Sequence, residues 1–443
     1  MTLRLILVRH GLSSFNLQKR IQGRNDLSTL TDQGILQAKQ AGKELAKIPI
    51  KKIYSSPLQR AADTATTLIQ ERSDNPQVIF DENLLEVDLF AWSGLTIEEV
   101  KSKFPDDYLI WKNDPNELVL NNKEGKEYFP IKELMSQATK FITQLLKDDQ
   151  SNKDSNVLIV GHNAILRCLI LKLLGEPKNG FRRLKVDNAS ISLVKVNKKG
   201  NETYHTQIES LNNTTHLGYP APQKGRKARL ILVRHGETNW NKEGRFQGQI
   251  DIPLNENGRD QANAAKVLLS SILFTKAFSS SMSRPLETAK IILKNQPNLK
   301  INCLEELIEI GHGLWEGKLE SEIKKEWSDM LEKWQNCPEK VQMPNGESIQ
   351  QVSNRAVSSW NEICKGLADN ETALIVAHDA VNKTILCYLL GLTPANIWMI
   401  KQGNGGVTVV DIQEGDEQPS VVACMNITSH LGGVIDLTAQ GAL

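Results

Sequence analysis

The sequence predicts an α/β protein built from two tandem three-layer α/β/α domains, each with a mostly parallel sheet flanked by helices. Two observations lead to this prediction. One series of motifs occurs twice, in the same order, along the 443 residues. Within each copy, short apolar runs alternate with segments that have helical periodicity. Strands that alternate with helices are typical of a parallel sheet with helices packed against it.

The repeat covers both halves of the chain. LILVRHG stands at residues 5–11 and again at 230–236. Three longer pairs follow in the same order: SSPLQRAADTA (55–65) with SSSMSRPLETA (279–289), LLEVDLFAWSGL (84–95) with LIEIGHGLWEGK (307–318), and NVLIVGHNAILRCLILKLLG (156–175) with TALIVAHDAVNKTILCYLLG (372–391). Between the copies, GYPAPQKGRKA has the composition of a solvated turn. We therefore predict a first domain over 1–218, a linker over 219–228 and a second domain over 229–443.

The first copy gives its elements in chain order, and the second copy is expected to repeat them. LRLILV (3–8) is a short apolar run, typical of a fully buried strand. Thr31 is the expected N-cap of a helix over 31–48, and Pro57 the first position of a helix over 57–71. The remaining elements are strands at 51–56 and 157–161, a helix at 163–174, and alternating strands at 191–197 and 204–210 joined by the hairpin turn NKKGN.

Three polar segments come directly after the buried strands. Arg9 and His10 follow the first strand, where Gly11 permits a tight turn. Arg60 lies in the first turns of the helix after the second strand, and His162 follows the third. Open α/β sheets bind ligands at the carboxyl edge of their strands. We therefore expect these side chains to lie close together.

These residue types suit a bound phosphate. A guanidinium fork matches phosphate oxygens, and the helix N-terminus beside His162 adds positive potential. Glu86, in an L-x-E segment, and Asn16 complete the set. Each has a plainer explanation: Arg60 as a surface residue, Glu86 as a solvated carboxylate and Asn16 as a helix cap. All of them recur in the second copy, which favours a phosphate site over coincidence; the counterparts are Arg234, His235, Asn241, Arg284, Glu309 and His378.

The segments LVRHGETNWN, SSSMSRPLETA, LIEIGHGLWEG and LIVAHD resemble the histidine phosphatase superfamily, the phosphoglycerate-mutase-like group. The resemblance covers essentially the whole chain, twice. It implies that His10 and His235 become phosphorylated and that Glu86 and Glu309 act as acid and base. It implies substrate binding by Arg9, Asn16, Arg60, His162, Arg234, Asn241, Arg284 and His378. Neither a metal nor another cofactor is expected.

The two halves resemble different members of the group. The second half, with G-x-W-E-G and P-N-G-E-S (344–348), is similar to cobalamin-pathway and broad-specificity phosphatases. The first half, with KRIQGRNDLSTLT, EVDLFAWSGL and the segment 111–134, resembles plant-type 2-carboxyarabinitol-1-phosphate phosphatases, which also have tandem domains. It departs from the common pattern at Leu12 and at Phe90-Ala91. We expect the loops at roughly 100–135 and 318–350 to set the substrate.

The function predicted from these features is a metal-independent phosphomonoesterase. It would hydrolyse a small phosphorylated metabolite, a sugar-acid or sugar phosphate, through a phosphohistidine intermediate. Two alternatives stay open. In the first alternative the chain would be a phosphoglycerate mutase, although IEIGHGLWEG stands where mutases carry E-R-x-Y-G-x-L-x-G. In the second, one half would be a non-catalytic phosphate-binding domain, and the first half is the candidate.

Composition excludes several other classes. The net charge is +1, so no overall field attracts nucleic acid or an anionic membrane surface. No apolar run is long enough to span a membrane, and six scattered cysteines without a C-x-x-C pair indicate reduced thiols. We predict a cytoplasmic protein with a small phosphorylated metabolite as partner and no nucleic acid or membrane; the oligomeric state is not determined. His216 and His430 are expected to be structural, and His205 and His312 to lie on the surface.

Overall fold

The computed structural model of the chain describes residues 2–74, 76–148, 154–199, 203–225, 227–413 and 420–438. The chain forms two compact units, residues 1–206 with 211–219 and residues 207–210 with 220–443. Each combines helices with a mostly parallel sheet, which confirms the predicted fold class. The domain boundaries placed at 218 and 229 from sequence stay a prediction.

The first half holds a sheet in the order β8-β7-β1-β6-β2-β3. β1 pairs parallel with β6, β6 with β2 and β2 with β3, whereas β7 runs antiparallel to β1. The strands of this half are β1 (Thr2–Arg9), β2 (Lys52–Ser55), β3 (Val78–Phe80), β4 (Leu120–Asn121), β5 (Glu127–Tyr128), β6 (Ser155–Gly161), β7 (Ile191–Lys199) and β8 (Thr203–Asn213). β4 and β5 form a separate two-stranded ribbon.

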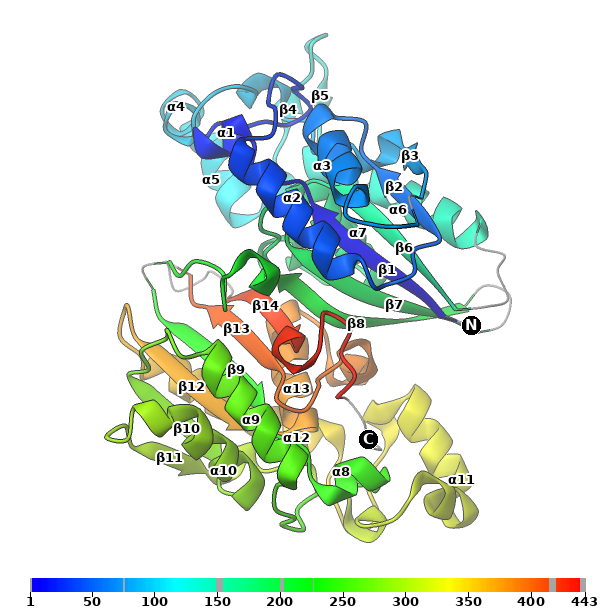
Figure 1. Cartoon of the computed structure of the whole chain (residues 1–443), viewed down its shortest axis with the longest axis vertical. Helices are drawn as coiled ribbons and strands as arrows, with labels where there is room; N and C mark the ends of the chain where they lie inside the picture. The colour runs from blue at the N-terminus through cyan, green and yellow to red at the C-terminus, as the bar shows by residue number, and fades with distance from the viewer. Residues whose placement is uncertain are drawn as a thin grey trace. The chain divides into compact units, whose positions relative to one another are not determined.

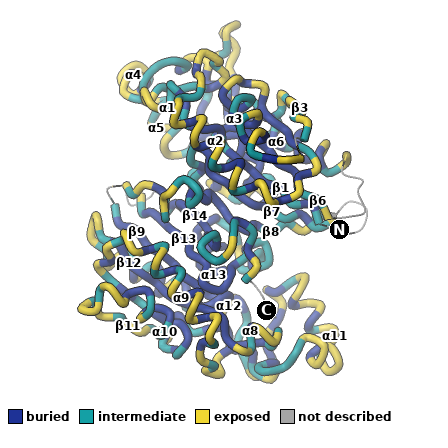
Figure 2. Tube along the Cα trace, viewed as in Figure 1, coloured by how far each residue is buried: buried dark blue, intermediate teal, exposed yellow. Residues whose placement is uncertain are grey.

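Helices pack against this sheet in two pairs, α2 with α3 and α6 with α7 (Figure 1). The helices of the first half are α1 (Ser14–Leu17), α2 (Asp32–Leu45), α3 (Gln59–Ile69), α4 (Ile97–Lys103), α5 (Pro105–Asn113), α6 (Pro130–Asp148) and α7 (Asn163–Leu173). In α2, Ala38, Ala41 and Leu45 recur at helical spacing and are fully buried. Figure 2 shows the same pattern, with buried strands between helices whose outer faces are exposed.

The second half repeats this arrangement with the strand order β11-β10-β12-β9-β13-β14. Its strands are β9 (Arg229–Arg234), β10 (Lys276–Ser280), β11 (Ile301–Leu304), β12 (Thr372–Ala377), β13 (Val407–Asp411) and β14 (Val421–Ile427). Its helices are α8 (Asn239–Glu243), α9 (Glu256–Leu268), α10 (Ser283–Ile292), α11 (Glu320–Asn336), α12 (Ile349–Lys365) and α13 (Asp379–Leu390). β9, β10, β11 and β12 are parallel neighbours, and β13 runs antiparallel to β9.

Most predicted elements are confirmed, with changes at their ends. Thr31 is the N-cap of α2, and its hydroxyl accepts a hydrogen bond from the Gly34 N–H at 3.0 Å. Pro57 is not the first residue of α3, because the chain is still extended at Leu58, with ψ 132°, and helical geometry begins at Gln59. Part of the predicted NKKGN turn between β7 and β8, residues 200–201, lies outside the described residues.

His312 is not on the surface, so that prediction was wrong. Its side chain is 0% exposed, and its ring centroid lies 5.2 Å from Phe246 and 6.1 Å from Trp334. Neither ring nitrogen has a hydrogen-bond partner within the described ranges. Burial lowers the pKa of His312 to about 3. A lone histidine between glycines gives no sign in sequence that distant aromatic residues enclose it. His205 is exposed, as predicted.

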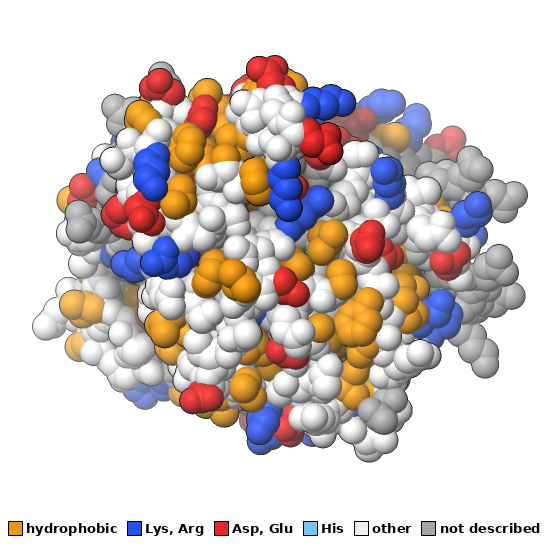
Figure 3. All heavy atoms as spheres, turned by 90° about the horizontal axis from the view of Figure 1, so that it is seen from above, with side chains coloured by type: hydrophobic (Ala, Val, Ile, Leu, Met, Phe, Trp, Pro, Cys, Tyr) orange, Lys and Arg blue, Asp and Glu red, His pale blue; other side chains and the backbone are white. Residues whose placement is uncertain are grey.

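The surface view in Figure 3 shows Lys and Arg side chains interspersed with Asp and Glu side chains on that face of the molecule. This distribution gives that face no large area of one charge sign. Among the helices that the structure describes, none is both long and apolar enough to cross a membrane. The predicted cytoplasmic location stays a prediction.

Candidate functional site

Three parallel strands bring the predicted residues of the first half together. β1, β6 and β2 are neighbours, and they end side by side at Arg9, Gly161 and Ser55. The backbone N–H of His10 donates to the Gly161 carbonyl at 3.0 Å. As a result the imidazole rings of His10 and His162 lie 5.2 Å apart between centroids.

His10 is held with one ring nitrogen committed and the other free to react. Its Nδ1 lies 2.7 Å from the carbonyl oxygen of Gly11, so Nδ1–H donates there and the lone pair remains on Nε2. The side chain is 2% exposed. Burial, and then the positive charges of Arg9 and Arg60, hold the pKa of His10 well below its usual value. The imidazole is therefore neutral near pH 7, as a nucleophile must be.

Gly11 is required for a reason that the sequence did not reveal. A Cβ atom at this position would lie 2.3 Å from the Gly34 carbonyl oxygen, at the beginning of α2. Close approach of two backbone segments, and not an unusual turn, explains the glycine after His10. The Gly11 N–H donates to Thr64 Oγ1 at 3.1 Å, which fixes the turn against α3.

Arg60 is buried and Arg9 is half-buried, and both are only partly engaged in hydrogen bonds. Arg60 is 1% exposed, and its terminal nitrogens donate to the carbonyls of Gly23 and Asn25, each at 2.9 Å. Arg9 donates from Nη1 to the Val186 carbonyl at 2.8 Å. The Nε atoms of both arginines have no hydrogen-bond partner within the described residues. Arg60 is thus neither a surface residue nor one half of a surface ion pair.

His162 is the N-cap residue of α7 and is 0% exposed. Its Nε2 lies 2.8 Å from Ser56 Oγ, and that hydroxyl also accepts weakly from the Leu58 N–H at 3.4 Å. We assign the Ser56 hydroxyl proton to the contact with Nε2, which leaves the ring proton of His162 on Nδ1. Nδ1 is buried and has no partner in the described part of the chain.

Glu86 occupies the helix N-terminus that was expected to hold an anion. Its carboxylate accepts from the N–H groups of Ala164, at 3.1 and 3.2 Å, and Ile165, at 3.2 Å. The positive end of α7 thus binds a carboxylate of the same chain, because a negative group stabilises a helix there. Glu86 is 9% exposed and is not a solvated loop residue.

Asn16 lies beside this group but is engaged as a cap residue. Its Oδ1 accepts from the Ser13 hydroxyl at 3.0 Å and from Asn188 Nδ2 at 3.1 Å. Asn188 also donates to the carbonyl oxygens of His10, at 3.0 Å, and Gly11, at 3.2 Å. These contacts of Asn16 therefore fit the capping explanation, and substrate binding by this residue stays a prediction.

The second half builds the same group. The rings of His235 and His378 lie 5.1 Å apart, and His235 Nδ1 lies 2.7 Å from the Gly236 carbonyl. Arg284 is 0% exposed, and its Nε donates to His235 Nε2 at 3.3 Å. His378 Nε2 lies 2.9 Å from Ser280 Oγ. Burial, and then the charges of Arg284 and Arg234, lower the pKa of His235 as well.

Glu309 takes the place of Glu86 in this half and is 3% exposed. Its Oε2 accepts from the Asp379 N–H at 3.0 Å, and its Oε1 from the Ile310 N–H at 2.9 Å. Burial, and then the neighbouring charge of Asp379, raise the pKa of Glu309. A carboxyl group with a raised pKa can carry a proton nearer neutral pH.

One buried ion network distinguishes the second half. Asp379 Oδ2 lies 2.7 Å from Lys383 Nζ, and its Oδ1 lies 3.4 Å from Arg234 Nη1. Asn163 and Arg167 stand at these positions in the first half. There Asn163 donates to the Val186 carbonyl and Arg167 to the Phe181 carbonyl, without an equivalent carboxylate between them.

Leu12, the first departure noted in sequence, stands where the second half has Glu237. Its counterpart Glu237 accepts a hydrogen bond from Asn255 Nδ2 at 2.8 Å, and Asn255 is the N-cap of α9. The glutamate therefore supports a helix end. In the first half the Thr31 cap bonds the Leu12 carbonyl instead, at 2.9 Å.

Four positioning residues were missed in sequence: Ser56, Ser280, Asn188 and Asn404. The serines hold the second histidine of each half. Asn404 donates to the His235 carbonyl at 3.2 Å, as Asn188 does to that of His10. The second serine of each S-S pair and the shared asparagine after α7 and α13 were the available signals.

His216 and His430 hold the same loops from the other side. Their Nε2 atoms lie 3.0 Å from the Ala189 carbonyl and 3.1 Å from the Gly405 carbonyl. Both contacts are to backbone, which agrees with the structural role expected of these residues. In the described ranges, no three His, Cys, Asp or Glu side chains form a group that could hold a metal ion.

Known proteins match this chain either along most of its length or over about one half of it. The sequence model of the "Histidine phosphatase superfamily (branch 1)" matches residues 5–209 and 230–425. "Probable 2-carboxy-D-arabinitol-1-phosphatase" of Arabidopsis thaliana is 26% identical over 97% of this chain and 88% of its own length. "2-carboxy-D-arabinitol-1-phosphatase" of Triticum aestivum is 27% identical over 97% and 86%. The solved structure of Bacillus stearothermophilus YhfR is 31% identical over 46% of this chain and 99% of its own, with a TM-score of 0.44.

Proposed function

Because the chain belongs to the histidine phosphatase superfamily and is a phosphatase of that type, we propose that both halves are metal-independent phosphomonoesterases. Their substrate is a small phosphorylated metabolite, a sugar-acid or sugar phosphate, and each reaction passes through a phosphohistidine. The reacting residues are His10 and Glu86 in the first half and His235 and Glu309 in the second.

Buried donors without partners carry this proposal. In the first half they are Arg9 Nε, Arg60 Nε and His162 Nδ1, and in the second Arg234 Nε and His378 Nδ1. A buried donor left unpaired costs about 1–3 kcal/mol. These five differ from other unpaired groups of the described residues, such as Arg167 Nε, because they surround the two histidines of each half. All five belong to the residues expected to bind a phosphoryl group. A phosphate dianion offers the acceptors and the charge that they lack.

Attack on phosphorus is by Nε2 of the first histidine in each half, His10 or His235. That nitrogen carries a lone pair, because Nδ1–H is donated to the following glycine. The Nε2–P bond forms as the bond from phosphorus to the ester oxygen breaks, and the arginines with the second histidine stabilise the equatorial oxygens. Water then attacks the phosphohistidine and releases inorganic phosphate.

Glu86 and Glu309 supply the proton in this scheme. Each donates it to the departing alkoxide and afterwards takes one from the attacking water. The raised pKa of Glu309 supports that role in the second half. The names of the two long relatives make a 2-carboxyarabinitol 1-phosphate ester the first candidate substrate.

The test is phosphate release from a panel of phosphorylated metabolites in the presence of EDTA. We compare the wild type with His10→Ala, His235→Ala and the double variant, and follow 3-phosphoglycerate by NMR in parallel. Each single variant is expected to keep one half's activity, and the double variant none.

Three results would contradict the proposal. Activity abolished by EDTA would remove the metal-independent mechanism. Isomerisation of 3-phosphoglycerate faster than its hydrolysis would make the chain a mutase. Wild-type activity unchanged in one single variant would make that half a binding domain.

A further inference from the structure

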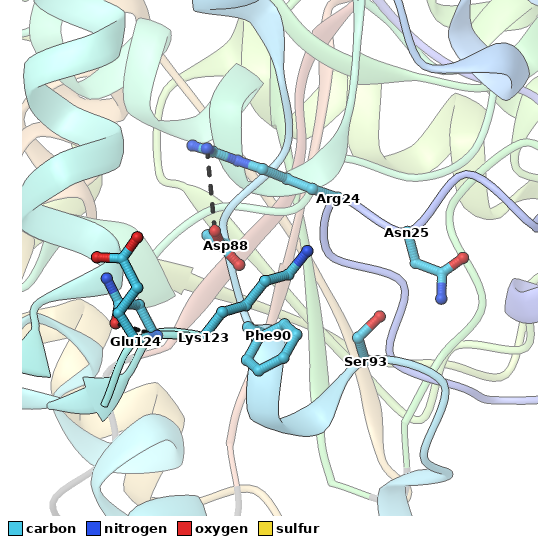
Figure 4. Close-up of a pocket in the computed structure, with 8 residues that line it drawn as sticks. Arg24, Asn25, Asp88, Phe90, Ser93, Lys123 and Glu124 are labelled. Atoms are coloured by element: carbon cyan, nitrogen blue, oxygen red, sulfur yellow. Dashed lines mark hydrogen bonds and ion pairs between the residues drawn. The ribbon is translucent and has the colours of Figure 1, made fainter. Parts of the chain in front are cut away.

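A cavity of about 610 Å³ opens beside the phosphoryl site of the first half. Three segments line it: the loop before α2, the stretch that follows Glu86, and the turn between β4 and β5. Figure 4 shows the side chains that face this space. The lining residues are Arg24, Asn25, Asp88, Phe90, Ser93, Asn122, Lys123 and Glu124.

Two lining residues, Asn25 and Arg24, connect this cavity to the predicted site residues. The Asn25 carbonyl accepts from Arg60 Nη1 at 2.9 Å, so one wall of the cavity is the backbone that Arg60 holds. Arg24 Nε donates to the Glu86 carbonyl at 3.1 Å. An ester whose phosphate is bound by Arg60 and whose leaving oxygen reaches Glu86 can extend its organic part toward this cavity, because Asn25 and Arg24 contact those two residues.

Lys123 places at the cavity a positive charge that has no carboxylate partner among the described residues. Its ammonium lies 5.4 Å from the centre of the Phe90 ring, and it forms no ion pair within the described residues. In Figure 4 it extends between Phe90 and Arg24, while the Glu124 carboxylate lies on the far side of the cavity. The other lining carboxylate, Asp88, is 3.9 Å from the guanidinium of Arg24.

The second half has the opposite charge at this place. Gly313 stands where the first half has Phe90, so the ring that supports Lys123 is missing. Glu316 replaces Ser93, and its carboxylate accepts from the backbone N–H groups of Gln249 and Ile250, each at 2.9 Å. Glu316 forms no ion pair in the part of the chain that the structure describes, although its charge interacts with that of Arg284.

We propose that Lys123, supported by Phe90, makes the first half select phosphate esters whose leaving group carries a second negative charge. The second half, with Glu316 in this place, does not select them. The inference rests on the proposed hydrolysis and adds a substrate class to it. The recognised group is a carboxylate or a second phosphate, because both are anions that an ammonium binds by charge and hydrogen bonding.

Two matched pairs of esters separate these groups. 3-Phosphoglycerate and glycerol 3-phosphate differ by a carboxylate, and fructose 1,6-bisphosphate and fructose 6-phosphate differ by a phosphate. Each is assayed as an inhibitor of p-nitrophenyl phosphate hydrolysis by the His235→Ala chain, in which the first half alone acts. The same series is repeated with His10→Ala.

In the His235→Ala chain, we expect the ester with the extra anion to bind about tenfold more tightly in at least one pair. Lys123→Gln should abolish this preference and change the neutral ester less than about twofold, whereas Lys123→Arg should retain it. Added salt should weaken the preference for the ester with the extra anion. Lys126→Gln removes the same charge from the same turn without touching the cavity, and should have no effect.

The result that overturns the inference is distinct from failure of the proposed function. Equal inhibition within both pairs, or equal effects of Lys123→Gln and Lys126→Gln, would overturn the charge selection while hydrolysis continues. A preference of the same size in the His10→Ala chain would also overturn it. Absence of hydrolysis in every variant would instead remove the proposed function.

Discussion

His10 Nδ1 lies 2.7 Å from the carbonyl oxygen of Gly11, its neighbour in the chain. A side chain bonded to the next backbone carbonyl cannot rotate without losing that hydrogen bond. The contact therefore fixes both the tautomer and the direction of the ring. His235 repeats it with Gly236, also at 2.7 Å.

This contact predicts where the phosphoryl group attaches. The phosphoenzyme should carry phosphate on Nε2 of His10 or His235, because Nδ1 is occupied in both. The check is to quench the enzyme in alkali during turnover and distinguish the two phosphohistidine isomers by phosphorus NMR. The His10→Ala chain should show the same Nε2 isomer, carried by His235 alone. Phosphate on Nδ1 would contradict the proposed orientation of attack.

Ser56 is predicted to position His162. Ser56→Ala removes the hydroxyl that bonds His162 Nε2 and should lower kcat/KM of the His235→Ala chain about tenfold. Ser56→Thr keeps a hydroxyl and should restore most of the rate. The matched control is Ser55→Ala, since Ser55 is equally buried but its hydroxyl bonds the Ser56 carbonyl. Equal losses in the two alanine variants would reduce the role of Ser56 to packing.

The loss of rate on replacing Glu309 is predicted to depend on the leaving group of the ester. In the His10→Ala chain, Glu309→Gln should slow phosphoryl transfer from an alkyl ester about 10²–10⁴-fold, because the alkoxide needs a proton. The first turnover of p-nitrophenyl phosphate should fall less than about tenfold, since nitrophenolate leaves unprotonated. Stopped-flow measurement of the first turnover decides this. Equal losses with both esters would exclude Glu309 as the acid.

Glu309 also predicts how the rate of phosphoryl transfer depends on pH. The pKa of Glu309 is raised, so its protonated form persists toward neutral pH. The rate of transfer from alkyl esters should therefore fall as pH rises through this raised pKa. The fall should be absent in Glu309→Gln, which no longer titrates. A pH profile of the His10→Ala chain with and without Glu309→Gln tests both statements.

His312 should make the second half sensitive to acid. Its folded pKa of about 3 lies below the ordinary 6.5, so the unfolded chain takes up a proton that the folded chain does not. Stability present above pH 6.5 is then lost as pH falls toward 3, by about 2 kcal/mol at pH 5 from this one residue. His312→Leu should lose correspondingly less free energy of unfolding between pH 7.5 and 5.0. Parallel urea curves in which both proteins lose the same amount would contradict this.

Much of the site could be predicted from sequence because it depends on local order. Arg9, His10 and His162 each follow a strand, and parallel strands end at one edge of the sheet, so their meeting is a consequence of topology. Thr31 was found as an N-cap for a similar reason, since capping involves residues three apart. Both relationships can be predicted from short segments of sequence, without knowing which distant residues pack together.

Tertiary structure alone decided the features that depend on residues far apart in the chain. Glu86 fills the N-terminus of α7, His312 is enclosed by Phe246 and Trp334, and Lys123 lies over Phe90 at the edge of the reacting groups. Each depends on how distant loops pack onto the sheet, and a repeat of motifs carries no information about that packing. The sequence determined which residues follow the parallel strands and so meet at the sheet edge, and the packing of distant loops determined the charged and aromatic groups that surround them.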